Sequence, residues 1–150
     1  LSYGDKMEIP AEEYLVPIGK AHIVREGDHV TLISHSRMVL LCEEAAKELQ
    51  TRGIQVELID LRTIKPLDID TIAISVGKTH FCVLVEEGHI FGGISAEVGF
   101  QIIEHCFDDL DAPLVRVAQK ETPMPYSKVL EKQTMPTKEQ IIEAVQKVLA

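Results

Sequence analysis

The sequence predicts an α/β fold, a three-layer sandwich around a mostly parallel five-stranded sheet with one antiparallel edge strand. First, short β-rich runs alternate with helical stretches four times from residue 30 onward, which is typical of a parallel sheet covered by helices on both faces. Second, residues 81–85 (FCVLV) are apolar without alternation, as in a strand that is buried on both sides. Third, 150 residues suffice for one domain with a sizeable core.

The individual elements follow from local patterns, taken in chain order. We expect strands at residues 18–24, 30–34, 56–60, 81–85 and 114–117, of which the first would lie at the sheet edge. We expect helices at about residues 37–52, 68–78, 95–106 and 137–149. Gly53 suits the position after a helix, Asp68 can cap the helix that follows it, and residues 137–140 read as a capping box. Residues 122–136 contain three prolines, which predicts an irregular loop.

The domain organisation is expected to be simple. Residues 1–17 are predicted to be an interdomain linker, and residues 18–150 to form one domain. Because the chain opens on Leu1 and not on methionine, we expect it to come from a longer protein. A chain of this kind could lack the chemical groups that the longer protein carries.

The composition excludes some classes of partner and favours another. Lysine and arginine number 15 against 24 aspartates and glutamates, so the formal net charge is −9. Such a domain is repelled by phosphate, which argues against nucleic acid and against an anionic membrane, and it favours a basic protein. The three cysteines, Cys42, Cys82 and Cys106, are widely spaced without a CxxC, which predicts buried thiols in a reducing compartment.

One glycine-rich stretch leaves a predicted strand and enters a predicted helix, where ligands of α/β folds often bind. Its candidate residues are Glu86, Glu87, Gly88, His89, Gly92 and Gly93. The stretch fits neither nucleotide fingerprint, and its two glutamates would repel a phosphate. We therefore expect a tight turn against which another domain or subunit packs, and we keep small-anion binding as the alternative. His89 is the best catalytic candidate among the six histidines, none of which has a metal-binding spacing.

Acidic residues form the second candidate site. Asp108, Asp109 and Asp111 precede Pro113, and the carboxylate of Ala150 would lie at the end of the last helix, where the helix dipole disfavours a negative charge. These groups would form a docking site for a basic partner, or the aspartates would simply be a solvated loop.

Several segments resemble the β subunit of the E1 component of pyruvate dehydrogenase, and they follow one another in the same order. They are residues 12–21 (EEYLVPIGKA), 59–68 (IDLRTIKPLD), 86–97 around Gly92 and Gly93, 110–113 (LDAP) and 123–126 (PMPY). The last two point to 2-oxoacid dehydrogenases and not to transketolase itself. The chain departs from the family pattern at Ser95, where many relatives have glycine, and at Lys120 and Glu121.

The resemblance implies a transketolase C-terminal domain within an α2β2 enzyme, whose partners are the E1 α subunit and a second β subunit. It implies thiamine diphosphate and Mg²⁺ in the holoenzyme, which decarboxylates pyruvate and acetylates the lipoyl group of E2. The usual signature for this cofactor needs an asparagine, and the chain has none. We therefore expect no catalytic, cofactor-binding or metal-binding residue here and an inactive isolated fragment. The resemblance also assigns Asp111 and the terminal carboxylate to docking of the E2 peripheral subunit-binding domain.

Two other interpretations of the function remain beside that of an E1 β subunit of pyruvate dehydrogenase. The chain could be a stand-alone regulatory domain that binds a small anion or nucleotide, or it could belong to the branched-chain 2-oxoacid enzyme. For the compartment we expect bacterial cytoplasm, with the mitochondrial matrix or plastid stroma as alternatives.

Overall fold

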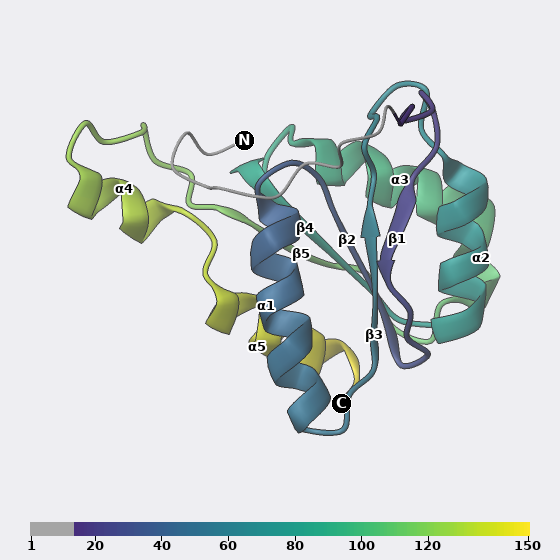
Figure 1. Ribbon diagram of the computed structural model, residues 1–150. Helices are drawn as coiled ribbons and strands as arrows, with labels where there is room; N and C mark the ends of the chain where they lie inside the picture. Colours follow the sequence, from purple (N-terminus) through teal and green to yellow (C-terminus); the bar gives the residue numbers. More distant parts are fainter. Residues whose placement is uncertain (1–13) are drawn as a thin grey trace.

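The computed structural model describes residues 14–150, and in them five strands form one sheet (Figure 1). The strands are β1 (His22–Arg25), β2 (Val30–Ser34), β3 (Val56–Asp60), β4 (Cys82–His89) and β5 (Val115–Gln119). Their order across the sheet is β1-β3-β2-β4-β5. β1 pairs antiparallel with β3, and the other neighbours are parallel, which confirms the predicted fold class.

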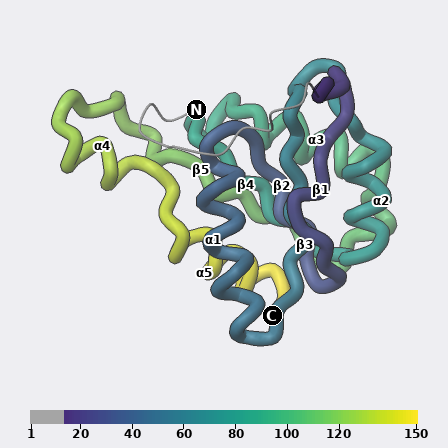
Figure 2. Tube along the Cα trace, in the orientation of Figure 1, coloured from purple at the N-terminus to yellow at the C-terminus, as the bar shows by residue number. Residues whose placement is uncertain are grey.

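Helices cover both faces of the sheet, as the alternating pattern predicts. α1 (Met38–Thr51) and α5 (Lys138–Val148) pack on one face, and α2 (Ile69–Thr79) and α3 (Ile94–Cys106) pack on the other. A short 3₁₀ turn, η1 (Phe107–Asp109), follows α3. The helix α4 (Lys128–Thr134) lies outside the three layers, as Figures 1 and 2 show.

The central strands divide the core into two layers because successive side chains point to opposite faces. One layer, below α1 and α5, includes Leu32, Leu58 and Val83, and the other, below α2 and α3, includes Ile33, Ile59 and Leu84. All six side chains are buried, and each contributes roughly 1.5–3 kcal/mol by its removal from water.

The predicted signals at the helix ends are confirmed. The side chain of Asp68 accepts a hydrogen bond from the backbone N–H of Thr71 at the start of α2. Gly53 follows α1 with a φ of 83°, a conformation that suits glycine. Thr137 and Gln140 form both hydrogen bonds of a capping box at the start of α5.

Besides the end of β4, which is described with the site, two segments differ from the prediction. β1 begins at His22 and not at residue 18. The predicted loop 122–136 contains the helix α4, because Pro123, Pro125 and Pro136 flank residues 128–134 and none lies within them.

Candidate functional site

The candidate residues fall at opposite edges of the sheet. We call the edge where the parallel strands end the carboxyl edge, and the edge where they begin the amino edge. The glycine-rich stretch lies at the carboxyl edge, between β4 and α3. The acidic residues lie at the amino edge, where η1 leads into β5.

The strand β4 runs further into the glycine-rich stretch than the sequence predicts. Residues 86–89 belong to the strand, because β5 pairs with β4 as far as His89, which lies opposite Gln119. The register shifts between Val85 and His89, so the strand bends here. The connection to α3 is thereby shortened to residues 90–93.

The buried side chain of Glu86 supports this connection between β4 and α3. The Ser95 hydroxyl donates a hydrogen bond to it from the first turn of α3. A Cβ atom at Gly93 would overlap the Glu86 carboxyl oxygen, so the close approach requires glycine. The start of α3 is therefore occupied by a carboxyl group of the chain itself, which argues against the alternative of anion binding at this helix end.

The rest of the stretch faces solvent. Gly88, His89 and Gly92 are exposed, and Glu87 is half-buried with its carboxylate 3.7 Å from Arg37. Phe91, which sequence reasoning did not single out, is 88% exposed. Within this stretch, so exposed an aromatic side chain is the clearest indication of a contact surface for another domain or subunit.

The glycine-rich stretch adjoins the proline-rich segment that follows β5. The backbone N–H of Phe91 donates a 3.1 Å hydrogen bond to Glu121. A cavity of about 490 Å³ lies between the two segments and is lined by His89, Phe91, Glu121, Thr122 and Pro123. His89 thus lines a surface groove that contains one carboxylate, that of Glu121.

The acidic residues of the amino edge are exposed and free of internal cations. Asp108 and Asp109 lie in η1, and Asp111 lies in the turn before β5. Within residues 14–150, no ion pair involves any of these three carboxylates. His80 fixes the backbone here, because its ring nitrogen lies 2.8 Å from the Asp109 carbonyl oxygen and its carbonyl accepts from the Asp111 N–H.

The end of the chain lies at the same edge. Ala150 is exposed and directly follows the last turn of α5. Its neighbour Leu149 packs against the same core layer as Ala112, which is adjacent to Asp111. Figure 1 shows the C-terminus near the start of β3, so Ala150 lies at the amino edge, as the three aspartates do.

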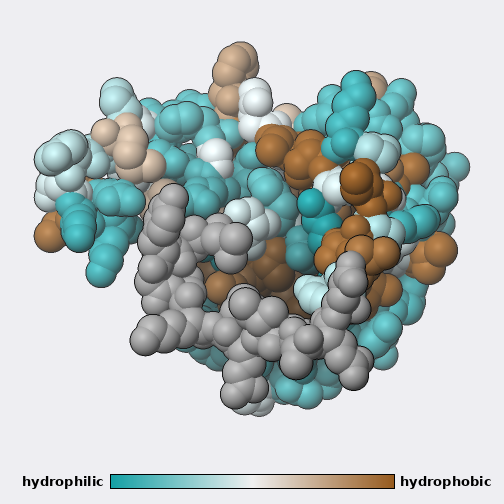
Figure 3. Space-filling model, turned by 45° about the horizontal axis from the view of Figure 1, so that its top comes forward, coloured by the Kyte–Doolittle hydropathy of each residue, from teal (hydrophilic) through white to brown (hydrophobic). Residues whose placement is uncertain are grey.

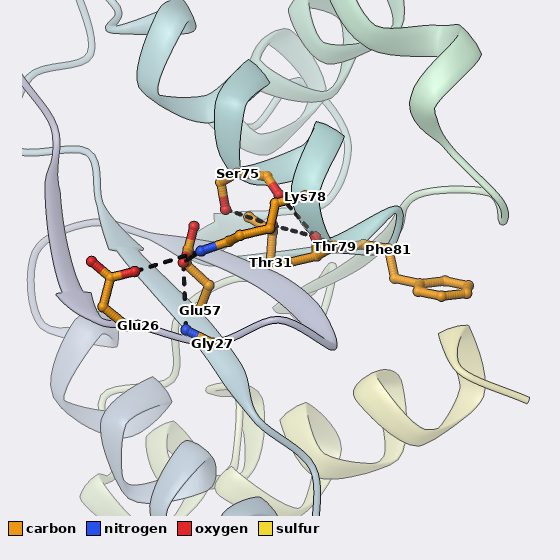
Figure 4. Close-up of polar contacts among 8 residues, drawn as sticks. All are labelled: Glu26, Gly27, Thr31, Glu57, Ser75, Lys78, Thr79 and Phe81. Atoms are coloured by element: carbon orange, nitrogen blue, oxygen red, sulfur yellow. Dashed lines mark hydrogen bonds and ion pairs between the residues drawn. The ribbon is translucent and has the colours of Figure 1, made fainter.

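The amino edge also contains a partly buried ion pair that sequence reasoning missed (Figure 4). Glu57 of β3 is buried, and the Lys78 ammonium at the end of α2 donates a hydrogen bond to its carboxylate. Burial raises the pKa of Glu57, but hydrogen bonds from Lys78, Ser75 and the Gly27 N–H outweigh it, so the pKa lies below its usual 4.5. The pair ties α2 to the sheet.

A hydroxyl network continues this contact between α2 and β2. The Thr31 hydroxyl lies 2.7 Å from those of both Ser75 and Thr79, and all three are buried (Figure 4). The three hydroxyls are therefore hydrogen-bonded to one another, and the Glu57 carboxylate is paired with Lys78. We assign this cluster a structural role.

Nucleophiles and metal ligands are not gathered in the described part of the chain. Burial raises the pKa of the Cys42 thiol to about 12, and it raises the pKa of Cys82 and Cys106 as well, so the thiols are unreactive. All three cysteines are free and buried, as predicted. Among residues 14–150, no three His, Cys, Asp or Glu side chains are arranged so that they could hold a metal ion. None of the helices in this range is long and apolar enough to cross a membrane.

Fold and surfaces together define a three-layer α/β domain with two exposed candidate contact edges. The family model described as "Transketolase, C-terminal domain" matches residues 19–141, and the chain belongs to this family. The resemblance seen in the sequence is thereby confirmed at the level of the family.

The chain is similar to curated β subunits of the pyruvate dehydrogenase E1 component. It is 49% identical to the mitochondrial subunit of Mus musculus over 99% of the chain and 43% of the relative. It is 48% identical to that of Caenorhabditis elegans over 95% of the chain and 41% of the relative, and 45% identical to that of Rickettsia felis over 97% and 45%. The chain thus spans less than half the length of these relatives.

Two solved structures share the fold. A split-gene transketolase, described as an inactive β4 tetramer, superposes with a TM-score of 0.77 and 26% identity over 95% of this chain and 45% of that one. A 2-oxoglutarate:ferredoxin oxidoreductase from Magnetococcus marinus has a TM-score of 0.59 and 13% identity over 87% of this chain and 19% of its own, which shows a likeness of fold alone.

Proposed function

We propose that this chain is the C-terminal part of the β subunit of a thiamine diphosphate-dependent pyruvate dehydrogenase E1, and that it serves assembly of the enzyme and docking of E2. The observation that carries this proposal is the 45–49% identity to such subunits across nearly the whole chain. The named relatives act on pyruvate, which favours this substrate over branched-chain 2-oxoacids.

Assembly with the E1 α subunit and a second β subunit would use the carboxyl edge. Its exposed residues include Phe91 and, in the segment before β1, Leu15 and Ile18. In Figure 3 this edge is turned toward the viewer, and a group of hydrophobic residues lies there among hydrophilic ones. Apolar surface of this kind is stabilised when another domain or subunit covers it. Residues 1–17 would link the domain to the rest of the protein, and residues 1–13 lie outside the described part.

The cofactor would be held elsewhere in the enzyme. In the holoenzyme, thiamine diphosphate would supply the electron sink for decarboxylation, and Mg²⁺ would help to bind its diphosphate. The described residues do not fit this group, because residues 14–150 offer no metal-ligand cluster and Glu86 fills the start of α3. We therefore assign the cofactor to the longer protein and to E1 α, and we expect no turnover by the chain alone. The inactive β4 tetramer of the split-gene transketolase supports this view.

Docking of E2 would use the amino edge. Asp111, with Asp108, Asp109 and Ala150, would hold basic side chains of the E2 peripheral subunit-binding domain. The exposed aspartates have no cation in the described residues, and the net charge of −9 would attract a basic partner from a distance. Charge-assisted hydrogen bonds would then fix the partner in place.

The docking proposal is tested by titrating the E2 domain into the chain in a calorimeter. Asp111→Ala is expected to weaken binding by about 10- to 100-fold, because a hydrogen bond between charged groups contributes roughly 1.5–3 kcal/mol. Asp28→Ala is the matched control, since Asp28 is also an exposed aspartate in a turn at the amino edge. Equal affinities of both variants, without dependence on salt, would refute the docking assignment.

For the compartment, the relatives include animal mitochondrial subunits and a bacterial one. Three free buried thiols suit any reducing compartment. We keep bacterial cytoplasm as the proposal, with the mitochondrial matrix or plastid stroma as alternatives.

A further inference from the structure

The residue that follows α2 has an unusual backbone conformation. α2 ends at Thr79, and His80 has a φ of 61°, in the left-handed region. Its backbone N–H donates a 2.8 Å hydrogen bond to the Val76 carbonyl oxygen, so it closes the last turn of the helix. Apart from glycine, this conformation is adopted mostly by asparagine, aspartate and histidine. The sharp turn directs both the ring and the carbonyl group of His80 toward the segment after α3.

His80 holds that segment at two points, on either side of Leu110. Its ring Nδ1 lies 2.8 Å from the Asp109 carbonyl oxygen, and its own carbonyl accepts a 3.0 Å hydrogen bond from the Asp111 N–H. A carbonyl oxygen has no proton to donate, so Nδ1 must carry the proton and act as the donor. Leu110, between the two contacts, packs against the core layer below α2 and α3. The turn that carries the acidic residues is thereby fixed at both ends.

The carboxylate of Asp109 lies against the last turn of α2. A Cβ atom at Gly77 would be 3.7 Å from its Oδ2, which is an ordinary contact distance. The C-terminal end of a helix carries a partial negative charge, so a carboxylate is disfavoured there until a cation approaches. Within residues 14–150, no cationic side chain forms an ion pair with Asp108, Asp109 or Asp111. A cation of a partner and a proton on His80 would therefore compensate the same negative charge.

We infer that His80 is a positioning residue of the docking site: it fixes the acidic turn for a basic partner, and it weakens docking when its ring takes up a second proton. The inference rests on the proposed function, because it concerns the aspartates that would hold the E2 domain. Groups that are held in their bound arrangement before the partner arrives lose less conformational entropy on binding. A second proton makes the ring a cation beside the acidic turn, which reduces the field that attracts a basic partner.

The other titratable groups on the elements around His80 are acidic, buried or already paired, with one exception. Lys78 of α2 is paired with Glu57 and Glu26. The remaining groups lie on η1, in the turn after it, in the last turn of α3 and at the start of β4, and they are Asp108, Asp109, Asp111, Glu104, His105, Cys106 and Cys82. Histidine is the side chain that ordinarily changes its charge between pH 5 and 8. The exposed His105 is therefore the group that the experiment must control for.

Positioning is tested by calorimetric titration of the E2 peripheral subunit-binding domain into the chain at pH 8. His80→Gly keeps the left-handed backbone but removes the ring donor, and binding should weaken about 3- to 10-fold, in line with the loss of one ordering hydrogen bond. His80→Asn should bind within about twofold of the wild type, because asparagine tolerates the same backbone and its amide nitrogen can take the position of Nδ1. Thermal unfolding of each variant verifies that it is folded.

The role of the proton is tested by the same titration at pH 5.5. Binding to the wild type should weaken by about threefold relative to pH 8, as expected for one added charge near the contact, and the difference should shrink in 500 mM NaCl. His80→Asn should lose this pH dependence, which a purely structural role of His80 would leave in place. His105→Asn is the matched control and should keep it. Titration of groups on the E2 domain is common to all variants, so the ratios between variants are compared.

The outcomes separate the inference from the proposed function. If Asp111→Ala weakens binding but His80→Gly does not, the docking site stands and positioning by His80 is wrong. If neither variant weakens binding, the docking site itself is wrong, and the inference falls with it. Retention of the wild-type pH dependence by His80→Asn, or its loss in His105→Asn, would overturn the role of the proton on His80.

Discussion

Two buried glutamates secure opposite edges of the same sheet, and they are stabilised in different ways. At the amino edge, Glu57 is held by the ammonium of Lys78, so the contact depends on a charge from another element. At the carboxyl edge, the Glu86 carboxyl group accepts a hydrogen bond from the Ser95 hydroxyl and lies at the start of α3, where the helix dipole favours a negative charge. The comparison indicates that the amino edge should respond strongly to pH and to loss of its cation, while the carboxyl edge should respond to the loss of a neutral donor.

The largest effect is expected from Lys78→Met, which leaves the Glu57 carboxylate buried without its cation. We expect the free energy of unfolding to fall by about 2–3 kcal/mol, less than for a fully buried pair because the Lys78 side chain is 40% exposed. Urea denaturation measures the change. Combining Lys78→Met with Glu57→Gln should recover part of the loss, and a double variant no more stable than the single one would contradict the ion-pair account.

The pH dependence of the wild-type chain should follow from the same pair. Because the pKa of Glu57 is lowered, its contribution is complete above the usual 4.5 and is lost as the pH falls through the lower folded value. Because the pKa of Lys78 is raised by Glu57, its contribution is complete below the usual 10.5 and is lost as the pH rises through the higher folded value. Lys78→Met should abolish the alkaline dependence and reduce or reverse the acid one, because burial still raises the pKa of Glu57 when the Lys78 hydrogen bond is gone, as stability measured across the pH range would reveal.

At the carboxyl edge, Ser95→Ala should destabilise the fold by about 1–3 kcal/mol, because it leaves the buried Glu86 carboxyl group without its hydroxyl donor. The loss should be smaller than that of Lys78→Met and is measured by urea denaturation. Ser127→Ala offers a control, since Ser127 caps α4 without a side-chain hydrogen bond. Equal losses in the two serine variants would argue against a role for the Glu86 contact.

The smallest effect concerns a neutral contact at the start of α5. Thr137→Ala removes the acceptor for the Gln140 N–H in the capping box, and we expect a loss of about 1 kcal/mol. Thr137→Ser keeps the hydroxyl and should retain most of the stability in thermal unfolding. The two variants would be indistinguishable if the capping hydrogen bond contributed nothing.

The sequence predicts the three layers of the fold well, because the periodicity of apolar residues indicates which face of each helix or strand is covered. It also predicts Asp68 and Thr137 as caps, since capping depends on one side chain and a few adjacent N–H groups. The burial of Glu57 could have been anticipated, because Val56, Leu58 and Ile59 around it belong to a strand covered on both faces. Its partner Lys78 could not, because it is 21 residues away in the sequence and reaches Glu57 only after α2 docks.

The surfaces were harder to predict than the core. Glu86 follows an apolar strand, so it looks like the first solvated residue of a loop, and only the pairing of β4 with β5 places it inside. The exposed apolar residues of α3 carried a signal, because Phe100 and Ile103 repeat beside the buried row of Val98, Ile102 and Cys106. Sequence alone does not separate a buried row from an exposed one on the same helix. Whether an apolar row meets its own sheet or another chain depends on tertiary packing.

The position of β4 in the sheet has a consequence for biosynthesis. A nascent chain that has emerged only through α3 presents the side of β4 that β5 will later occupy, beside the apolar residues Val83 and Val85. Unpaired apolar strands of this kind aggregate readily. β5 and α5, which leave the ribosome later, remove that hazard by covering the strand. Premature termination after α3 should therefore yield an insoluble product and not a smaller soluble domain.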